Sequence, residues 1–487
     1  MPAVFLKILQ STHSPPDYIP PPLLAPDQVI CGPHYPDSRN GKRVISIKTA
    51  SGSYDIAPVV ASLPLEQRPD LFVARVDSSG VNLPANVAGL KCRKVLLLGD
   101  THHLAKPLQR LIGYALQEHY DAIIIDYDRH HAHFFIEAGI GPVYWLPGIN
   151  IRRLPVQPKA KPDIPFSFVG QAGKFHPRRR ALCQSLIAAG LPLRVMSATS
   201  AQTRALHARS RVNLNCSLNG DFNLRFMEVL ASGGFLLSDR LNPASGLDLL
   251  FIEGVHYVAY DDDRDCVEKA WALLADPDLT RKIASAGKSH YEAHYSTDRI
   301  LGDFFALIDA GTVRPEFDLA LERRCQGATA TDRAAVLGRA ALYEIVQAIH
   351  IGRERVRMLV SPGVDPAFVT DCADLPRLDL AAEDIEGSQF QPRLLAAGFA
   401  GRITSAGQGG AHNPAQWDLL AATVSEWRAG WAQGILAANL HAMLLLTDVQ
   451  ASDSVAAEIA EAGLTQVATD TPLYARNAAS PNPGGGA

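Results

Sequence analysis

The sequence lacks paired cysteines, long hydrophobic runs and an excess of charge of either sign. Its seven cysteines are an odd number, and no two of them form a CxxC pair. This spacing argues against a disulfide framework and against a zinc site. The apolar runs stay short of the ~20 residues that a membrane-spanning helix needs. We therefore expect a reduced protein without an integral membrane segment.

The charge balance narrows the range of partners. The chain is 47% hydrophobic and 20% charged, with a formal net charge of -4. This balance predicts no bulk attraction to nucleic acid or to acidic lipid, so no nucleic-acid partner is expected. The first residues lack the charged, apolar and cleavage regions of a signal peptide, which favours a cytoplasmic location. At 487 residues, two or three domains are expected.

Short apolar runs alternate with segments of helical spacing from about residue 43 onward, whereas residues 1–40 are rich in proline and are expected to be irregular. Such alternation predicts a parallel sheet covered by helices on both faces. Helices are expected at 106–118 and 129–138. We predict an N-terminal Rossmann-like domain over 1–150. Its expected strands are "RVISIKTA", "DLFVARVDSS", "RKVLLLGDT", "DAIIIDYD" and "VYWLPG".

A proline-rich segment, "RRLPVQPKAKPDIP" at 152–165, reads as a linker. After it the strand–helix alternation restarts and continues to a helix near 297–309, which predicts a second Rossmann-like domain over 151–312. In open α/β sheets, ligands bind beyond the carboxyl ends of the strands. With two such domains, the cleft between them is the expected site.

The remaining chain predicts an accessory C-terminal domain over 313–475, either α/β or mainly helical. A helix is expected near 331–350, strands at "RVRMLVSPG" and "LPRLDLAAEDIEG", and a long helical stretch over 417–446. The tail 476–487, rich in proline and glycine, is expected to be disordered. We expect this block to serve acceptor recognition or interaction, through a protein partner or self-association.

The most informative stretch is "NLNCSLNGDFNLRFMEVLASGGFLLSD" at 213–239. Asn223 suits a helix N-cap, and a glycine pair ends the helix. Arg225 and Glu228 share a face that the apolar stripe leaves free. A helix N-terminus and an arginine fork suit phosphates, and a glutamate can accept hydrogen bonds from ribose hydroxyls. The alternative is an exposed Arg–Glu pair worth a few tenths of a kcal/mol.

At these residues the chain resembles a known family. "NLRFMEVLASGGFLLSDR", "LFIEGVHYVAYDD" and "CVEKAWALLADPDLTRKIASAGKSHYEAHYSTDRI" are similar to the C-terminal half of group-1 glycosyltransferases, in the branch that includes spore-maturation glycosyltransferase-like proteins. The resemblance covers 210–305 well and 165–210 loosely. It implies a GT-B fold of two facing Rossmann-like domains and sugar transfer to an unidentified acceptor. The second domain would bind a nucleotide-sugar donor, a co-substrate, without any further cofactor.

The resemblance also implies roles for particular residues. Glu228 matches the family glutamate at the nucleotide ribose, and Arg225 matches the arginine just before it. Gly170 matches the glycine after the first strand of the donor domain. Lys174 and Arg178 stand where diphosphate contacts are expected.

The sequence departs from the family at one position. Many group-1 enzymes carry an earlier glutamate, eight positions before the second one; here that position is Gly220, with Asp221 beside it. The resemblance therefore leaves the contact with the donor sugar unassigned. Two alternatives stay open: a nucleotide-sugar epimerase on the same fold, and a non-catalytic glycosyltransferase-like module that binds glycan or partners.

Histidines gather in the first domain. Asp100, His102 and His103 follow the strand "KVLLL" and are candidates for the base that activates an acceptor hydroxyl; a helix cap with exposed histidines is the alternative. In "DYDRHHAHFF" at 126–135, His130 and His133 have helical spacing, which suggests a metal site. A helix packed beside the cleft explains it as well, so no metal is predicted.

Overall fold

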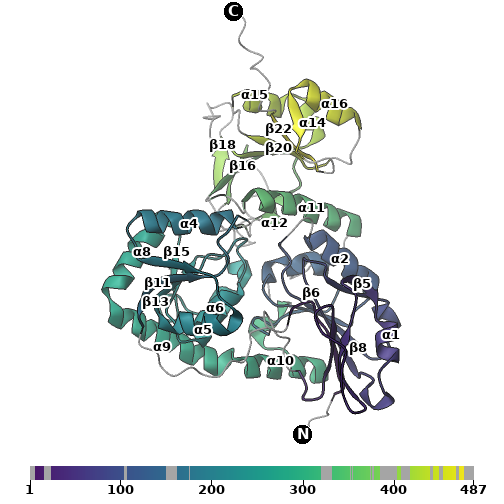
Figure 1. Ribbon diagram of the computed structural model, residues 1–487. Coiled ribbons are helices and arrows are strands. Elements are labelled where there is room, and N and C mark those ends of the chain that lie inside the picture. Colours follow the sequence, from purple (N-terminus) through teal and green to yellow (C-terminus); the bar gives the residue numbers. More distant parts are fainter. Residues whose placement is uncertain are drawn as a thin grey trace, which may run out of the picture. The chain divides into compact units, whose positions relative to one another are not determined.

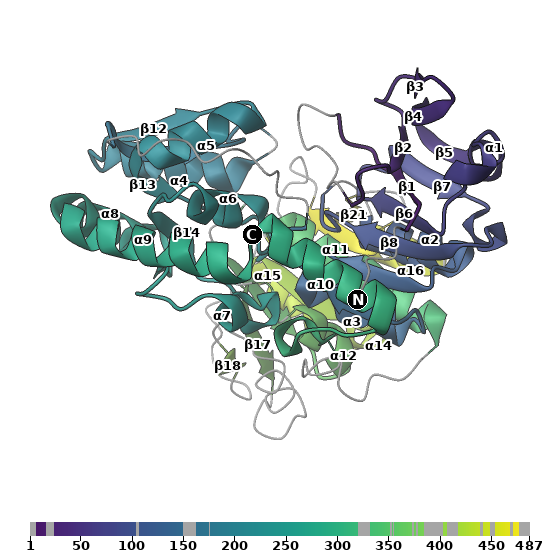
Figure 2. The same ribbon diagram turned by 90° about the horizontal axis from the view of Figure 1, so that it is seen from below.

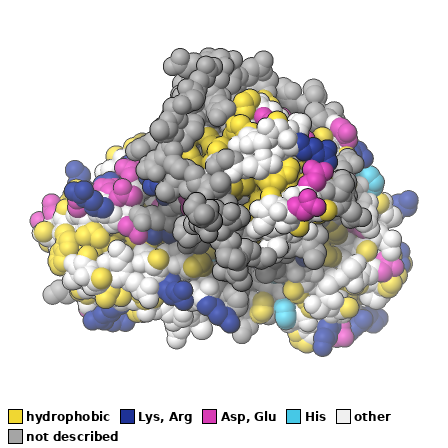
Figure 3. Space-filling view, turned by 90° about the horizontal axis from the view of Figure 1, so that it is seen from above, with side chains coloured by type: hydrophobic (Ala, Val, Ile, Leu, Met, Phe, Trp, Pro, Cys, Tyr) yellow, Lys and Arg dark blue, Asp and Glu magenta, His cyan; other side chains and the backbone are white. Residues whose placement is uncertain are grey.

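The chain forms two compact units, 1–340 and 341–487, in a computed structural model. Most of the predicted linker (152–165) and of the predicted disordered tail (476–487) lies outside the described residues. Among the described helices, none combines the length and apolarity that crossing a membrane requires. Charges of both signs are interspersed on the face that Figure 3 shows. The structure describes residues 6–15, 24–103, 107–149, 162–174, 176–319, 332–350, 353, 355–372, 375, 378–383, 403–406, 417–438, 442–448, 453–467 and 471–476.

The first sheet has eight strands in the order β10-β9-β8-β6-β1-β2-β4-β3. Every neighbouring pair is parallel except β3 with β4. All residues of β6 and β9 are buried, as expected for strands covered on both faces. The strands are β1 (Ile8–Ser11), β2 (Val29–Gly32), β3 (Ser38–Asn40), β4 (Arg43–Lys48), β6 (Leu71–Val76), β8 (Arg93–Leu98), β9 (Ala122–Ile125) and β10 (Val143–Trp145).

The expectation that residues 1–40 are irregular is wrong, because they contain β1, β2 and β3. β1 is fully buried between β2 and β6 at the centre of the sheet. Its apolar run is short and prolines follow closely, so the sequence pattern reads as loop although the tertiary structure makes a strand. The smaller elements are β5 (Gly52–Asp55), paired with β7 (Asn82–Ala85), helices α1 (Ala57–Ala61), α2 (Pro107–Glu118) and α3 (Ala132–Glu137), and the 3₁₀ turns η1 (Leu65–Gln67), η2 (Val87–Gly89) and η3 (Arg129–His131).

The second sheet has five parallel strands in the order β12-β11-β13-β14-β15. The strand order reverses between β11 and β13, the point where ligands bind in open α/β sheets. The strands are β11 (Ile164–Val169), β12 (Leu193–Met196), β13 (Ser210–Leu214), β14 (Leu236–Asp239) and β15 (Val258–Tyr260). The helices are α4 (Pro177–Ala188), α5 (Ser200–Arg209), α6 (Leu224–Ala231), α7 (Leu247–Leu250), α8 (Asp263–Ala275), α9 (Pro277–His294) and α10 (Thr297–Ala310), with turns η4 (Pro243–Ser245) and η5 (Pro315–Phe317).

The two domains built on these sheets belong to one compact unit and contact each other. Helix α10 returns to the first domain, where the Arg93 guanidinium donates a hydrogen bond to the Ile308 carbonyl (Figures 1 and 2). Arg129 donates to the Ala244 carbonyl at 3.2 Å. The Trp145 ring packs edge-on against Phe222, with 6.3 Å between centroids. The carboxyl ends of the central strands of both sheets thereby face a shared cleft.

The second unit is α/β. Its seven-stranded sheet has the order β18-β17-β16-β19-β20-β22-β21, parallel except for the two pairs made by β22. The expected long helix over 417–446 is wrong, because β19 and β20 lie in it. Both are central strands, and a continuous apolar run cannot be told from a buried helix by its period. The strands are β16 (Val356–Val360), β17 (Leu378–Glu383), β18 (Ile403–Ala406), β19 (Leu419–Ala422), β20 (Met443–Leu446), β21 (Leu464–Gln466) and β22 (Leu473–Arg476). Helix α11 (Arg333–His350) begins in the first unit and continues into the second, whose other helices are α12 (Pro366–Asp371), α14 (Val424–Arg428), α15 (Trp431–Ala438) and α16 (Asp453–Glu461).

The predicted fold class is confirmed: two Rossmann-like α/β domains face each other across a cleft, and a further α/β domain follows. The predicted limits at residues 150 and 312 stay a prediction.

Candidate active site

A cavity of about 520 Å³ lies between the two domains of the first unit. Its walls come from the carboxyl ends of β1, β6, β8 and β9 on one side, and of β11 together with the start of α6 on the other. Seven of the nine predicted site residues with binding or catalytic roles line it. The ionisable and predicted residues in its walls are His13, Arg75, Asp77, Asp100, His102, His103, Tyr127, Gly170, His176, Arg179, Asp221, Asn223, Arg225 and Glu228.

Arg225 is held in place at the start of α6. Its Nε donates to the Val169 carbonyl at 2.8 Å, and its Nη1 donates to the Asn215 side-chain oxygen at 2.8 Å. The guanidinium lies over the Phe168 ring, 4.4 Å from the centroid. Burial, reinforced by the positive charge of nearby Arg179, lowers the pKa of Arg225 to about 10, so the group remains charged at neutral pH. A fixed cation therefore faces the cavity.

Gly170 is required by the position of this arginine. A Cβ added at residue 170 would lie 2.2 Å from the Arg225 Nη2 atom, and the glycine has a φ of +146°. Any larger residue would displace the guanidinium. The family glycine therefore has a physical reason in this chain: it lets the end of β11 approach Arg225.

Glu228 lies one helical turn further along α6 and also lines the cavity. Its carboxylate has no hydrogen-bond partner among the described residues. Burial raises the pKa of Glu228 to about 7, although the nearby Arg225 charge opposes the rise. The two side chains form no ion pair within 4 Å, so the alternative of an exposed Arg–Glu pair is not what the structure contains. A half-buried acid without a hydrogen-bond partner in the described part of the chain is a candidate for ligand binding.

Asn223 is the N-cap residue of α6 by position, but its side chain makes no capping bond. Its Nδ2 instead donates to the Asn215 side-chain oxygen at 3.1 Å. Asn215 therefore accepts from both Asn223 and Arg225. It fixes the entry to the helix, and the sequence pattern alone did not single it out.

The predicted diphosphate contacts Lys174 and Arg178 do not line the cavity. Arg178 is 3% exposed and donates to the Asp263 carboxylate at 2.9 Å. Its neighbour Arg179 lines the cavity and is fixed by a 2.8 Å hydrogen bond from its Nε to the Cys216 carbonyl. Consecutive helical residues point about 100° apart, so only one of these two arginines can face the cleft.

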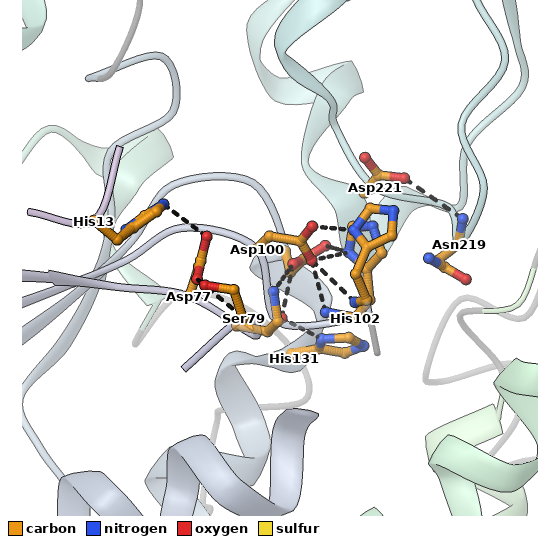
Figure 4. Close-up of polar contacts among 11 residues, drawn as sticks. His13, Asp77, Ser79, Asp100, His102, His131, Asn219 and Asp221 are labelled. Carbon is orange, nitrogen blue, oxygen red and sulfur yellow. Dashed lines mark hydrogen bonds and ion pairs between the residues drawn. The ribbon is translucent and has the colours of Figure 1, made fainter. Parts of the chain in front are cut away.

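His102 is a buried cation on the other side of the cavity. Its Nδ1 lies 2.9 Å from an Asp128 oxygen and 3.3 Å from an Asp100 oxygen (Figure 4). Burial opposes its charge, but the carboxylates of Asp100 and Asp128 raise the pKa of His102 to about 10. A histidine that keeps its proton at neutral pH is a fixed positive charge and a poor general base.

His103 forms a different pair. Its Nδ1 is hydrogen-bonded to the Asp100 carboxylate, and its ring is 37% exposed. Although burial favours the neutral acid, His102 and His103 hold the pKa of Asp100 below its usual value. The centroid of the His103 ring lies 6.2 Å from the centroid of the His176 ring, which comes from the other side of the cleft. An oriented, accessible imidazole of this kind can accept a proton from a hydroxyl group.

Asp221 places an acid in the cavity close to where the family glutamate is missing. It is 4% exposed and comes from the loop between β13 and α6. Its charge is one of the causes that raise the pKa of His102. The loop therefore carries a carboxylate that reaches the first domain.

A second histidine–acid pair was missed by the sequence reasoning. The His13 Nε2 lies 2.7 Å from an Asp77 oxygen (Figure 4). Burial opposes the ionised form, but His13 and Ser79 hold the pKa of Asp77 below its usual value. Each residue follows a buried parallel strand, β1 and β6. Asp77 could have been predicted, because it lies near the end of the expected strand "DLFVARVDSS". His13 could not, because the sequence pattern did not predict β1.

Among the described residues, two groups bring potential metal ligands within 4.8 Å of one another: Asp100 with His102 and His103, and Asp128 with His130 and His131. Metal binding needs neutral imidazoles with free ring nitrogens. In the first group His102 is held as a cation, and His103 uses Nδ1 on Asp100. Oxygens of Asp128 already accept from His102 and from the Thr101 hydroxyl. These contacts fit acid–histidine pairs better than a metal centre.

Comparisons with known proteins agree with part of this picture. A family model described as glycosyl transferase-like matches residues 155–306, the second domain. No curated protein matches the chain. Solved structures similar to the chain include sucrose-phosphate synthase from Thermosynechococcus elongatus (12% identity, TM-score 0.42, 63% of this chain and 99% of the other), TarM from S. aureus (10%, 0.39, 49% and 55%) and phage T4 BGT in complex with UDP-glucose (9%, 0.37, 62% and 99%). The chain spans about half the length of TarM. Because these TM-scores are low, the similarities do not indicate the activity of this chain.

Proposed function

We propose that this protein is a glycosyltransferase that moves a sugar from a nucleotide-sugar donor to an acceptor. One observation supports this most strongly: Arg225 and Glu228 line the same interdomain cavity as the acid–histidine pairs of the first domain. The match of residues 155–306 to the glycosyl transferase-like family supports the same assignment.

The second domain would bind the donor. The N-terminus of α6 and the guanidinium groups of Arg225 and Arg179 suit a diphosphate. They are fixed before the substrate arrives, so they stabilise the negative charge that develops on the leaving diphosphate without reorganising. The ionised carboxylate of Glu228 would accept hydrogen bonds from the ribose hydroxyls. Because the pKa of Glu228 is about 7, nucleotide binding should weaken as pH falls below 7.

The first domain would activate the acceptor. His103 is the proposed base, and Asp100 is the residue that positions it. Such a base is needed if the reaction inverts the configuration of the sugar. His102 and its two acids would keep the loop after β8 in place and would contribute a fixed positive charge.

The test is a calorimetric titration of the full chain with UDP, GDP, dTDP and ADP. We expect one nucleotide to bind well and Glu228→Ala to weaken it more than tenfold. Glu268→Ala, an exposed acid on α8 in the same domain, is the matched control and should bind like the wild type. If the folded wild type binds none of these nucleotides, the proposal is wrong.

The proposal extends to finer points. The order of the motifs within 210–305 supports the branch that includes spore-maturation glycosyltransferase-like proteins. We further propose a cytoplasmic protein without a resident cofactor or metal. Its second unit would serve acceptor recognition, a protein partner or self-association.

A further inference from the structure

Arg75 is a buried cation of the first domain that takes no part in the proposed donor site. It lies on β6, in the middle of the first sheet between β1 and β8, and is 2% exposed. Its side chain lines the cavity from the first-domain side. The Nη1 atom donates to the Ser14 hydroxyl at 3.2 Å, and the buried Nε has no hydrogen-bond partner.

No carboxylate in the described part of the chain lies within 4 Å of this guanidinium. Asp77 is the acid two residues further along the chain, just beyond the end of β6. Its oxygens are engaged by His13 at 2.7 Å and by the Ser79 backbone N–H at 3.0 Å. A buried guanidinium with one neutral hydroxyl partner lacks most of what compensates its desolvation. Such a guanidinium either destabilises the fold or receives its missing hydrogen-bond acceptors from a ligand.

We propose that Arg75 binds an anionic group, a phosphate or a carboxylate, carried by the acceptor. A guanidinium offers a planar fork of donors that matches both anions, and in a shielded cavity this contact is stronger than at a surface. Ser14 lines the same wall; its hydroxyl oxygen accepts from Arg75, which leaves its O–H to donate to an anion beside the fork. The inference rests on the proposed function, because it assigns the anion to the acceptor side of the cavity. The donor side has its own arginines, Arg179 and Arg225, in the second domain.

The experiment uses the full chain saturated with its nucleoside diphosphate, so that the donor arginines are occupied. Inorganic phosphate and acetate are titrated separately at constant ionic strength, with chloride as the balancing ion, and binding is followed by calorimetry. We expect at least one of the two anions to bind at one site per chain. Arg75→Gln should weaken that binding at least tenfold and leave nucleotide affinity within twofold. The preferred anion tells a phosphate from a carboxylate acceptor.

Two further variants complete the test. Arg43→Gln removes an exposed arginine from the same sheet and should bind both anions like the wild type. Arg75→Lys keeps the charge without the fork, should weaken binding by severalfold, and replaces Arg75→Gln if that variant does not fold.

The outcomes separate the two proposals. Equal anion binding by the wild type and both Arg75 variants, or no anion binding by the nucleotide-saturated wild type, would overturn the acceptor inference alone. A loss of nucleotide binding in Arg75→Gln would assign the arginine to the donor and overturn it as well. Absence of nucleotide binding by the wild type, measured first and without added anion, would overturn the proposed function instead.

Discussion

Glu228→Gln should stabilise the fold at alkaline pH while it impairs nucleotide binding. Burial raises the pKa of Glu228 from 4.5 to about 7, so the folded chain holds this proton at pH values where the unfolded chain has lost it. Stability therefore falls as pH rises from about 4.5 to 7, and the full cost is present above pH 7. Glutamine has nearly the same shape and carries no charge to bury.

The pKa rise corresponds to at most about 3 kcal/mol at pH 8. The carboxylate reaches the cavity, where solvent screens part of this cost, so we expect a gain of ~1–3 kcal/mol in Glu228→Gln. By the same dependence of stability on pH, the cost of ionising Glu228 is only about 1 kcal/mol at pH 5.5. The gap between variant and wild type should therefore widen as pH rises.

The assay is the melting temperature of the ligand-free full chain by calorimetry at pH 5.5 and pH 8. Glu268→Gln, at an exposed position on α8, serves as the control and should follow the wild type at both pH values. A Glu228→Gln variant less stable than the wild type at pH 8, or a gap independent of pH, would refute the reasoning. The acid would then be a stabilising part of the fold.

Four further variants have defined outcomes. Gly170→Ala should lower nucleotide affinity at least tenfold in calorimetry without unfolding the chain, because the new Cβ would displace Arg225; unchanged affinity would show that the close approach is unimportant. His102→Asn should cost about 3 kcal/mol, because it leaves the buried Asp128 carboxylate without its cation. The pKa of His102 is raised from 6.5 to about 10, so its contribution is full below pH 6.5 and lost as pH rises through 10. The melting temperature of the variant should lack that alkaline decline. Arg179→Gln should weaken nucleotide binding about tenfold, and Arg178→Gln should lower only the melting temperature; the reverse pattern would contradict the positions of the two side chains.

Parts of this structure are accessible from the sequence because they depend on local signals. Strand–helix alternation predicts both Rossmann-like domains, and spacing along α6 predicts that Arg225 and Glu228 share a face. Asp100 could be assigned to the cleft because the carboxyl ends of parallel strands lie on one edge of the sheet.

The remaining features depend on tertiary contacts. The role of His102 is set by Asp128, a residue from a neighbouring strand end, which turns a predicted base into a fixed cation. In "PRRR" the sequence cannot say which arginine turns toward the cleft, because this depends on the rotation of α4 about its axis. Arg75 lies in a run that has the pattern of an ordinary buried strand, and only the structure reveals that no carboxylate of the described residues pairs with it.

The most direct test of sugar transfer is the release of nucleoside diphosphate from the nucleotide sugar that the chain binds. The reaction would be followed with and without a panel of neutral and phosphorylated sugars, and the products would be separated by mass spectrometry. We predict acceptor-dependent release in equal amounts with a glycosylated product, lost in Glu228→Gln. Tight binding of the nucleotide sugar with no release under any condition would contradict the account and indicate a binding module. An epimerised sugar formed without an acceptor would contradict it in favour of an epimerase.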